Sequence, residues 1–241
     1  MHITSERLLD DGVVERDLTL GGTTGLLWTA GAAPAPLILV GHPGGLRTMY
    51  PRVAGRARYY AREHGFHAAA LELPGAGDRP PRPGADEARA DLRRALEARE
   101  PVDEIVDRLV LPLVDEAVPE ARAALDELLA LPEMEGRVGC DGGVLAIGLR
   151  LALVDPRVRA AVLFAGSFVP RQVVEECRRL TVPVQLLLQW DDEWNDRQAA
   201  LDVFDAIGSA EKTLHANLGG HTGVPAYELA QAGDFFVRHL R

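Results

Sequence analysis

Four short segments of the sequence place chemically capable residues beside glycines. They are "GHPGG" at 41–45, "GCDGG" at 139–143, "QWDDEW" at 189–194 and "NLGGHTGVP" at 217–225. The second segment offers a thiol and a carboxylate, the third offers carboxylates, and the fourth offers a histidine. A carboxylate that orients a histidine, and a histidine that activates a nucleophile, are the groups that acyl transfer requires.

The elements that must position these segments are strands and helices in alternation. A hairpin is predicted over 13–20 and 24–30, because "GG" between two strand patterns supplies a tight turn. Strands follow at 35–41, 66–72, 136–140, 158–165, 182–189 and 211–217, and the helices between and after them are predicted at 49–64, 119–130, 144–154, 171–179, 197–207 and 225–239. We therefore expect an α/β fold: a mostly parallel twisted sheet of about eight strands with helices on both faces. Each of the four segments follows a strand, and ligands bind beyond the carboxyl ends of parallel strands.

The order of the segments resembles that of the α/β-hydrolase fold, and specifically its dienelactone-hydrolase-like branch. The resemblance runs from "GHPGG" through "LPGAGDRP" and "DPRVRAAVLFAG" to "GGH", nearly the whole chain. It implies that His221 is the catalytic base and that an aspartate is the acid. Asp192 fits the family pattern best, and Asp191 is the second choice. A histidine base also needs a carboxylate on its Nδ1 side on chemical grounds alone. The alternative is that these are ordinary loop and turn residues.

The resemblance also implies an oxyanion site made of backbone N–H groups after the third strand of that fold. Pro43 has no N–H to offer, so Gly44 is the candidate donor, with Gly142 as the second. His42 is expected to contact substrate beside them. Trp190 and Trp194 flank the acid and could shape an aromatic or polyketide-sized pocket, although a packing role fits them equally well.

The segment "EGRVGCDGGVLAIGLRLALVDPRV" at 135–158 should carry the nucleophile, yet it contains no serine. With Asp141 as nucleophile, Gly139 and Gly143 fill the two positions that require small residues. With Cys140 as nucleophile, the segment is similar to the cysteine turn of true dienelactone hydrolases. If the motif is aligned forward from "GRVG", Val144 occupies the nucleophile position. If it is aligned backward from "DPRV", Gly142 occupies that position. Either of these last two alignments leaves no covalent nucleophile.

Chemistry does not decide among these alternatives. Haloalkane dehalogenases use an aspartate but follow it with a tryptophan, where this chain has Gly142. Epoxide hydrolases use lid tyrosines, and residues 80–118 contain none. An aspartate next to Cys140 disfavours its thiolate. Ser167 follows the next strand and is not expected to replace the missing serine.

A proline-rich and arginine-rich run, "GDRPPRPGADEARADLRR", begins at Gly77 and interrupts the alternation. We expect an insertion at about 79–118, after the fourth predicted strand. Its two helical faces, around Ala88 to Leu96 and Val106 to Val114, are predicted to form two helices of a lid.

Length, charge and cysteine content limit the number of domains, the partners and the cellular location that we expect. A chain of 241 residues that is 47% hydrophobic fits one α/β-hydrolase domain over 1–241. A net charge of -10 disfavours nucleic-acid partners, and no apolar run suits a signal peptide or a membrane span. Two cysteines are too few for a disulfide framework, so we expect a cytoplasmic protein. We expect no cofactor and no metal, a small-molecule substrate, and compatibility with a homodimer.

The favoured activity is hydrolysis of an ester, lactone, thioester or similar bond. The first alternative is a lyase or cyclase of the same fold, in which His221 and Asp141 transfer protons. The second is a catalytically silent binding protein. Substrate identity does not follow from the fold.

Overall fold

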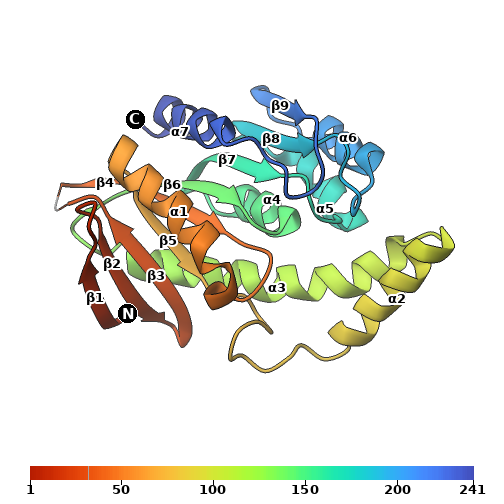
Figure 1. The fold of residues 1–241 in the computed structure, drawn as a ribbon, viewed down its shortest axis with the longest axis horizontal. Coiled ribbons are helices and arrows are strands. Elements are labelled where there is room, and N and C mark those ends of the chain that lie inside the picture. The colour runs from red at the N-terminus through yellow and green to blue at the C-terminus, as the bar shows by residue number, and fades with distance from the viewer. Residues whose placement is uncertain (32) are drawn as a thin grey trace.

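Residues 1–31 and 33–241, which the computed structural model describes, form one nine-stranded sheet (Figure 1). The strand order is β1-β2-β3-β5-β4-β6-β7-β8-β9. The bounds are β1 His2–Leu8, β2 Val14–Leu20, β3 Thr23–Thr29, β4 Ala35–Gly41, β5 His67–Leu71, β6 Met134–Gly142, β7 Val158–Phe164, β8 Val184–Gln189 and β9 Lys212–Asn217. Strands β1, β2 and β3 pair antiparallel, β3 is antiparallel to β5, and all other pairs are parallel. The expected mostly parallel α/β sheet is confirmed.

Strand β1 is an addition to the eight strands that the sequence predicts. All seven of its residues are exposed, so it buries no apolar face and carries no clear pattern of alternation. It is held by backbone pairing with β2 and by side-chain contacts such as the ion pair of Glu6 with Arg16. The edge strand therefore extends the sheet without enlarging the core.

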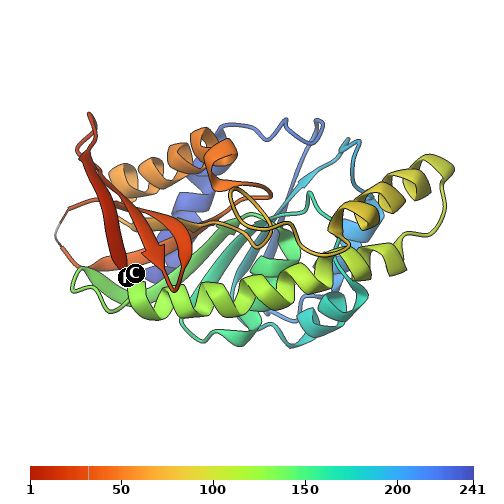
Figure 2. The same cartoon turned by 90° about the horizontal axis from the view of Figure 1, so that it is seen from below.

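Helices cover both faces of the sheet (Figures 1 and 2). On one face, α1 (Leu46–His64) and α7 (Tyr227–Leu240) pack over a core that contains Trp28, Tyr60 and Phe236. On the other face lie α3 (Asp103–Leu128), α4 (Leu145–Val154), α5 (Arg171–Glu176) with the short 3-10 helix Cys177–Arg179, and α6 (Arg197–Ala206). Among the described residues, no helix is both long enough and apolar enough to cross a bilayer.

The insertion differs in detail from its prediction. Helix α2 (Ala85–Ala98) is present, but α3 runs without interruption from Asp103 to Leu128, where separate helices were predicted before and after residue 118. The separate-helix prediction was wrong because Pro112 and Pro119 lie inside one helix. Each proline removes a backbone hydrogen bond, whereas the buried face that α3 presents to the sheet continues past both prolines and stabilises the helix.

Helix α2 and the N-terminal part of α3 form an arm that extends beyond the sheet (Figures 1 and 2). Residues 79–118 do not line the cavity that contains His221. The role of this arm as a lid stays a prediction.

The ends of β4 and β6 approach each other closely through glycines. A Cβ atom on Gly143 would lie 2.8 Å from the Cα atom of Gly41, and one on Gly41 would lie 2.8 Å from the Cα atom of Gly143. Both distances are too short for any real Cβ atom, so neither position accepts a side chain. This contact sets the turn after β6 directly against the turn after β4.

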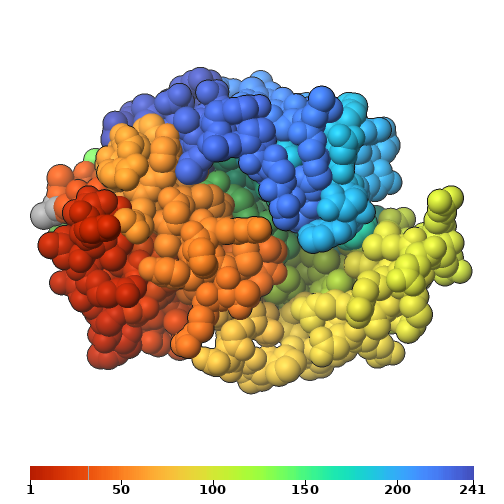
Figure 3. Space-filling view, in the orientation of Figure 1, coloured from red at the N-terminus to blue at the C-terminus, as the bar shows by residue number. Residues whose placement is uncertain are grey.

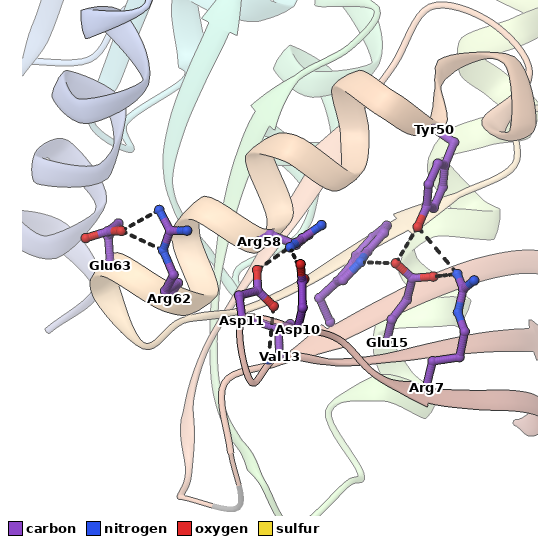
Figure 4. A network of polar contacts seen from close by, with 10 residues as sticks. Arg7, Asp10, Asp11, Val13, Glu15, Tyr50, Arg58, Arg62 and Glu63 are labelled. Atoms are coloured by element: carbon purple, nitrogen blue, oxygen red, sulfur yellow. Dashed lines mark hydrogen bonds and ion pairs between the residues drawn. The ribbon is translucent and has the colours of Figure 1, made fainter.

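A buried carboxylate joins α1 to the antiparallel end of the sheet (Figure 4). Glu15 of β2 accepts hydrogen bonds from the indole of Trp28 at 2.7 Å and from the hydroxyl of Tyr50 at 2.8 Å, and it pairs with Arg7. Further along α1, Arg58 pairs with Asp11 at 2.7 Å. These contacts fix the position of α1, which carries part of the candidate site.

We predict that Gly143→Ala lowers the free energy of unfolding by about 2–4 kcal/mol, since it combines a positive φ with a collision against β4. The φ of Gly143 is 85°. Gly12→Ala is the matched control, because Gly12 has a φ of 82° but open space around its Cβ position. It should cost only about 1 kcal/mol. Urea unfolding of both variants measures the difference, and equal losses would contradict the packing argument.

Candidate active site

His221 and Asp192 meet beyond the carboxyl ends of β8 and β9. The Nδ1 atom of His221 lies 2.8 Å from Oδ2 of Asp192. It is Asp192, and not the exposed Asp191, that makes this contact. The side chain of Asp192 is 4% exposed and that of His221 is 19% exposed. The carboxylate is therefore shielded from water, while the imidazole keeps access to a cavity.

The segment after β8 holds the Asp192 carboxylate in a fixed orientation. Its Oδ1 accepts the backbone N–H of Trp194 at 2.9 Å, and its Oδ2 also accepts the side-chain amide of Asn195 at 3.1 Å. The indole of Trp194 stacks at a tilt on the His221 ring, with centroids 4.6 Å apart, and Phe164 meets that ring edge-on at 5.3 Å. Both rings restrict the imidazole to one orientation.

The loop that carries His221 is anchored by a second buried carboxylate. Glu228, in the first turn of α7, accepts the side-chain amide of Asn217 at 2.9 Å and contacts Nδ1 of His215 at 2.8 Å. Tyr227 donates its hydroxyl to Asn217 at 2.6 Å. Because Asn217 ends β9 and Glu228 lies in the first turn of α7, the loop between them is tied at both ends.

A cavity of about 510 Å³ lies between α1 and the His221 loop, where the surface is hollowed in Figure 3. Its polar or charged wall residues include Arg56, Asp141, Ser167 and His221. Its apolar wall residues include Met49, Val162, Phe164, Leu187 and Leu229. A mostly apolar hollow with a few convergent polar groups is the usual form of a small-molecule site.

The turn after β6 presents backbone rather than a side chain at its tip. Strand β6 ends at Gly142, and α4 begins at Leu145. Gly142 has a φ of 65° and Gly143 a φ of 85°, conformations that favour glycine. Gly142, the predicted second oxyanion donor, lies in the cavity wall.

Asp141 is buried at the end of β6 and paired with a cation. Its Oδ2 accepts Nη1 of Arg56 at 3.0 Å. Burial raises the pKa of the Asp141 carboxyl above its usual range, and Arg56 opposes that rise. Tyr60, whose hydroxyl has no hydrogen-bond partner in the described part of the chain, has a pKa raised well above its usual value by burial and then by the nearby charge of Asp141.

Cys140 is placed away from His221. Neighbouring residues of a strand point to opposite faces, and Cys140 belongs to the core on the α3 and α4 face. It borders a separate cavity of about 70 Å³, which His221 does not line. Burial raises the pKa of its thiol to about 12.

Four further predicted site residues do not line the His221 cavity: Trp194, which stacks on the His221 ring, and His42, Gly44 and Trp190. His42 is buried, with Nδ1 2.6 Å from the carbonyl oxygen of Gly44 and Nε2 2.9 Å from that of Leu71, so its ring bonds to backbone rather than facing the cavity. Gly44 lines neither this cavity nor the smaller one. Trp190 is half exposed and stacks against the guanidinium of Arg197 at 4.4 Å.

The structure adds Arg56, which the sequence did not indicate, and a contact of Ser167 that the sequence did not predict. Arg56 reaches from α1 to the end of β6, and nothing distinguishes it in sequence from the other arginines of this helix. Ser167, after β7, accepts the backbone N–H of Leu145 at 3.1 Å and borders the same cavity as His221. Its position after a neighbouring strand was visible in the sequence, but its contact with the start of α4 depends on the sheet order.

No protein-family model and no curated protein matches the chain. Solved structures do match it over its whole length. A cold-adapted esterase from an Arctic intertidal metagenomic library is 27% identical with a TM-score of 0.76, and both chains are covered completely. TT1662 from Thermus thermophilus is 18% identical with a TM-score of 0.67, covering 100% of this chain and 99% of that one. The esterase Pf2001 from Pyrococcus furiosus is 11% identical with a TM-score of 0.64, covering 100% and 91%. The chain has the α/β-hydrolase fold of these structures.

We predict that neither cysteine reacts with Ellman's reagent in the folded protein at pH 8. Burial raises the pKa of both Cys140 and Cys177 to about 12. Only about one thiol in ten thousand would then be ionised. Both should react at once after unfolding in urea. Rapid labelling of a thiol in the folded protein that the Cys140→Ala variant lacks would reveal an activated cysteine and restore Cys140 as a nucleophile.

Proposed function

We propose that this protein hydrolyses esters of small molecules, with His221 as general base and Asp192 as the carboxylate that orients it. One observation carries the proposal: the pair, 2.8 Å apart, opens onto a cavity of about 510 Å³. The full-length likeness to a cold-adapted esterase at 27% identity supports this reaction class. Lactones and thioesters share the same carbonyl chemistry and fall within the proposal.

The contacts of the pair assign a role to each ring nitrogen. With Nδ1 bonded to Asp192, the neutral imidazole carries its proton on Nδ1 and leaves Nε2 free to accept one. Asp192 then stabilises the imidazolium that forms. The packing of Trp194 and Phe164 against the ring limits its rotation during the transfer.

Water is the proposed nucleophile. The backbone tip at Gly142 offers no side chain, the carboxylate of Asp141 is held by Arg56, and Cys140 borders the other cavity. His221 removes a proton from a water molecule as the water oxygen bonds to the carbonyl carbon. The resulting tetrahedral oxyanion collapses, the C–O bond to the alcohol breaks, and the alcohol leaves with the proton from His221.

A lyase or cyclase reaction is the second candidate, supported by Asp141. This carboxyl group borders the His221 cavity and has a pKa raised by burial, so it can hold a proton more readily than an exposed aspartate. His221 and Asp141 could then exchange protons with one substrate. Turnover without incorporation of solvent oxygen into the product would favour this candidate.

We predict that His221→Ala lowers kcat/KM for activated esters such as p-nitrophenyl acetate by about 10²–10⁴-fold, the usual contribution of a general base. Asp192→Asn should also lower it, because the amide can stabilise the wrong tautomer of His221. Asp191→Asn is the matched control and should retain wild-type activity, since its side chain is exposed. Equal activity in the Asp192 and Asp191 variants would contradict the proposed pair.

We also predict that intact-mass spectrometry detects no acyl adduct after the protein is mixed with activated esters, even in His221→Ala. A water nucleophile forms no covalent intermediate that could accumulate. The Asp141→Ala and Cys140→Ala variants identify the site if an adduct does form. An adduct that disappears with either substitution would replace water by that residue.

A further inference from the structure

The space into which a side chain at Gly142 would project is filled by Arg56. A Cβ atom built on Gly142 would collide with Nη1 of the Arg56 guanidinium. Gly142 ends β6 with a φ of 65°, and both Gly142 and Arg56 line the His221 cavity. A cation therefore occupies the space that a side chain at position 142 would need.

The guanidinium of Arg56 is held by three acceptors at the ends of β4 and β6. Its Nη1 donates to Oδ2 of Asp141 at 3.0 Å and to the carbonyl oxygen of the same residue at 3.3 Å. Its Nη2 donates to the carbonyl oxygen of Gly41 at 2.5 Å. The group is thus positioned by backbone as well as by charge, and it cannot move away without losing all three contacts.

Part of the guanidinium remains available to a ligand. An arginine side chain has five N–H donors, and the contacts above use three of them. Within residues 1–31 and 33–241, the Nε–H and one Nη2 N–H have no partner. The side chain is 27% exposed and borders the cavity. Two unpaired donors on a fixed cation are suited to an oxygen that carries negative charge.

We propose that Arg56 is the oxyanion-binding catalytic residue of this cavity. The inference rests on the proposed ester hydrolysis and names the group that holds the carbonyl oxygen during it. The unpaired N–H groups bind that oxygen, and their hydrogen bonds strengthen as the carbonyl π electrons move onto it. When the tetrahedral intermediate collapses, the electron pair returns to the carbonyl and the alcohol leaves as described above. Arg56 itself gains and loses no proton.

The first test compares two arginines of the same helix. Arg56→Met should lower kcat/KM for activated esters by about 10²–10³-fold, as the loss of an oxyanion donor does. Arg62→Met is the matched control, because Arg62 is exposed, does not line the cavity and, among the described residues, pairs only with its neighbour Glu63 (Figure 4), and it should keep wild-type activity. Equal activity of Arg56→Met and wild type would overturn the proposal.

A double variant separates catalysis from folding. Arg56→Met alone leaves the buried Asp141 carboxylate without its cation, which can destabilise the protein. Arg56→Met with Asp141→Asn removes both charges and should recover stability in urea unfolding but not activity. Recovery of full activity in this folded double variant would overturn the proposal.

Chemical rescue tests the charge directly. In Arg56→Ala, guanidinium chloride at low millimolar concentration should restore part of the lost activity, since it can enter the vacated space. Urea at the same concentration has a similar planar shape without the charge and should restore nothing. Equal rescue by urea would show that volume, and not the cation, is what the site requires.

Anion binding distinguishes the failure of this inference from the failure of the proposed hydrolysis. Methyl phenylphosphonate, a tetrahedral anion, should bind the wild-type protein in calorimetry and bind Arg56→Met at least tenfold more weakly. Binding that depends on Arg56 without any ester hydrolysis would overturn the proposed reaction and retain the anion site. Ester hydrolysis that depends on His221 but not on Arg56 would retain the proposed reaction and overturn the role of Arg56. If the protein shows neither phosphonate binding nor ester hydrolysis, both the anion site and the proposed reaction are overturned.

Discussion

The close approach of β4 and β6 at Gly41 and Gly143 is the constraint on which the site depends. Neither glycine can carry a side chain, because a Cβ atom on each would meet the backbone of the other. The carbonyl oxygen of Gly41 and the carboxylate of Asp141 are thereby brought close enough for one guanidinium to bind both. Arg56 in turn links α1 to these strand ends. The floor of the cavity and one of its walls are therefore fixed by the same set of contacts.

The opposite wall is fixed independently, by carboxylates in a different part of the chain. Asp192 holds the imidazole of His221, and Glu228 holds the two ends of the loop that carries it. No residue of α1 takes part in these contacts. The cation on α1 and the base on the His221 loop thus face one cavity from two separately braced supports. In the proposed reaction a substrate carbonyl lies between these two fixed groups, and preorganised groups are what accelerate a reaction.

The sequence predicts those features that depend on local pattern. Apolar runs bounded by glycine and proline predict eight strands, and the resemblance to the α/β-hydrolase fold implies the pair at Asp192 and His221. It does not predict β1, whose residues are all exposed, or the continuity of α3 through Pro112 and Pro119. It also cannot predict Arg56, because the contact with Asp141 joins residues 85 positions apart and depends on how α1 packs over the sheet. The turn at Gly142 could be aligned in several ways, and only its backbone conformation indicates where a side chain would point.

With Arg56 at the turn after β6 and water as the proposed nucleophile, the cavity must hold the water and the ester at the same time. In a covalent mechanism, the alcohol can leave before water enters, so one small space serves both in succession. With water as the nucleophile, water and intact ester must occupy the cavity together, and His221 must reach the water while the carbonyl oxygen meets its donor. A cavity of about 510 Å³ accommodates both, since a water molecule takes only about 30 Å³ in the liquid. Under the proposed mechanism the bare backbone at Gly142 and the guanidinium beside it act together, because Arg56 binds the carbonyl oxygen from the space that a side chain at position 142 would fill.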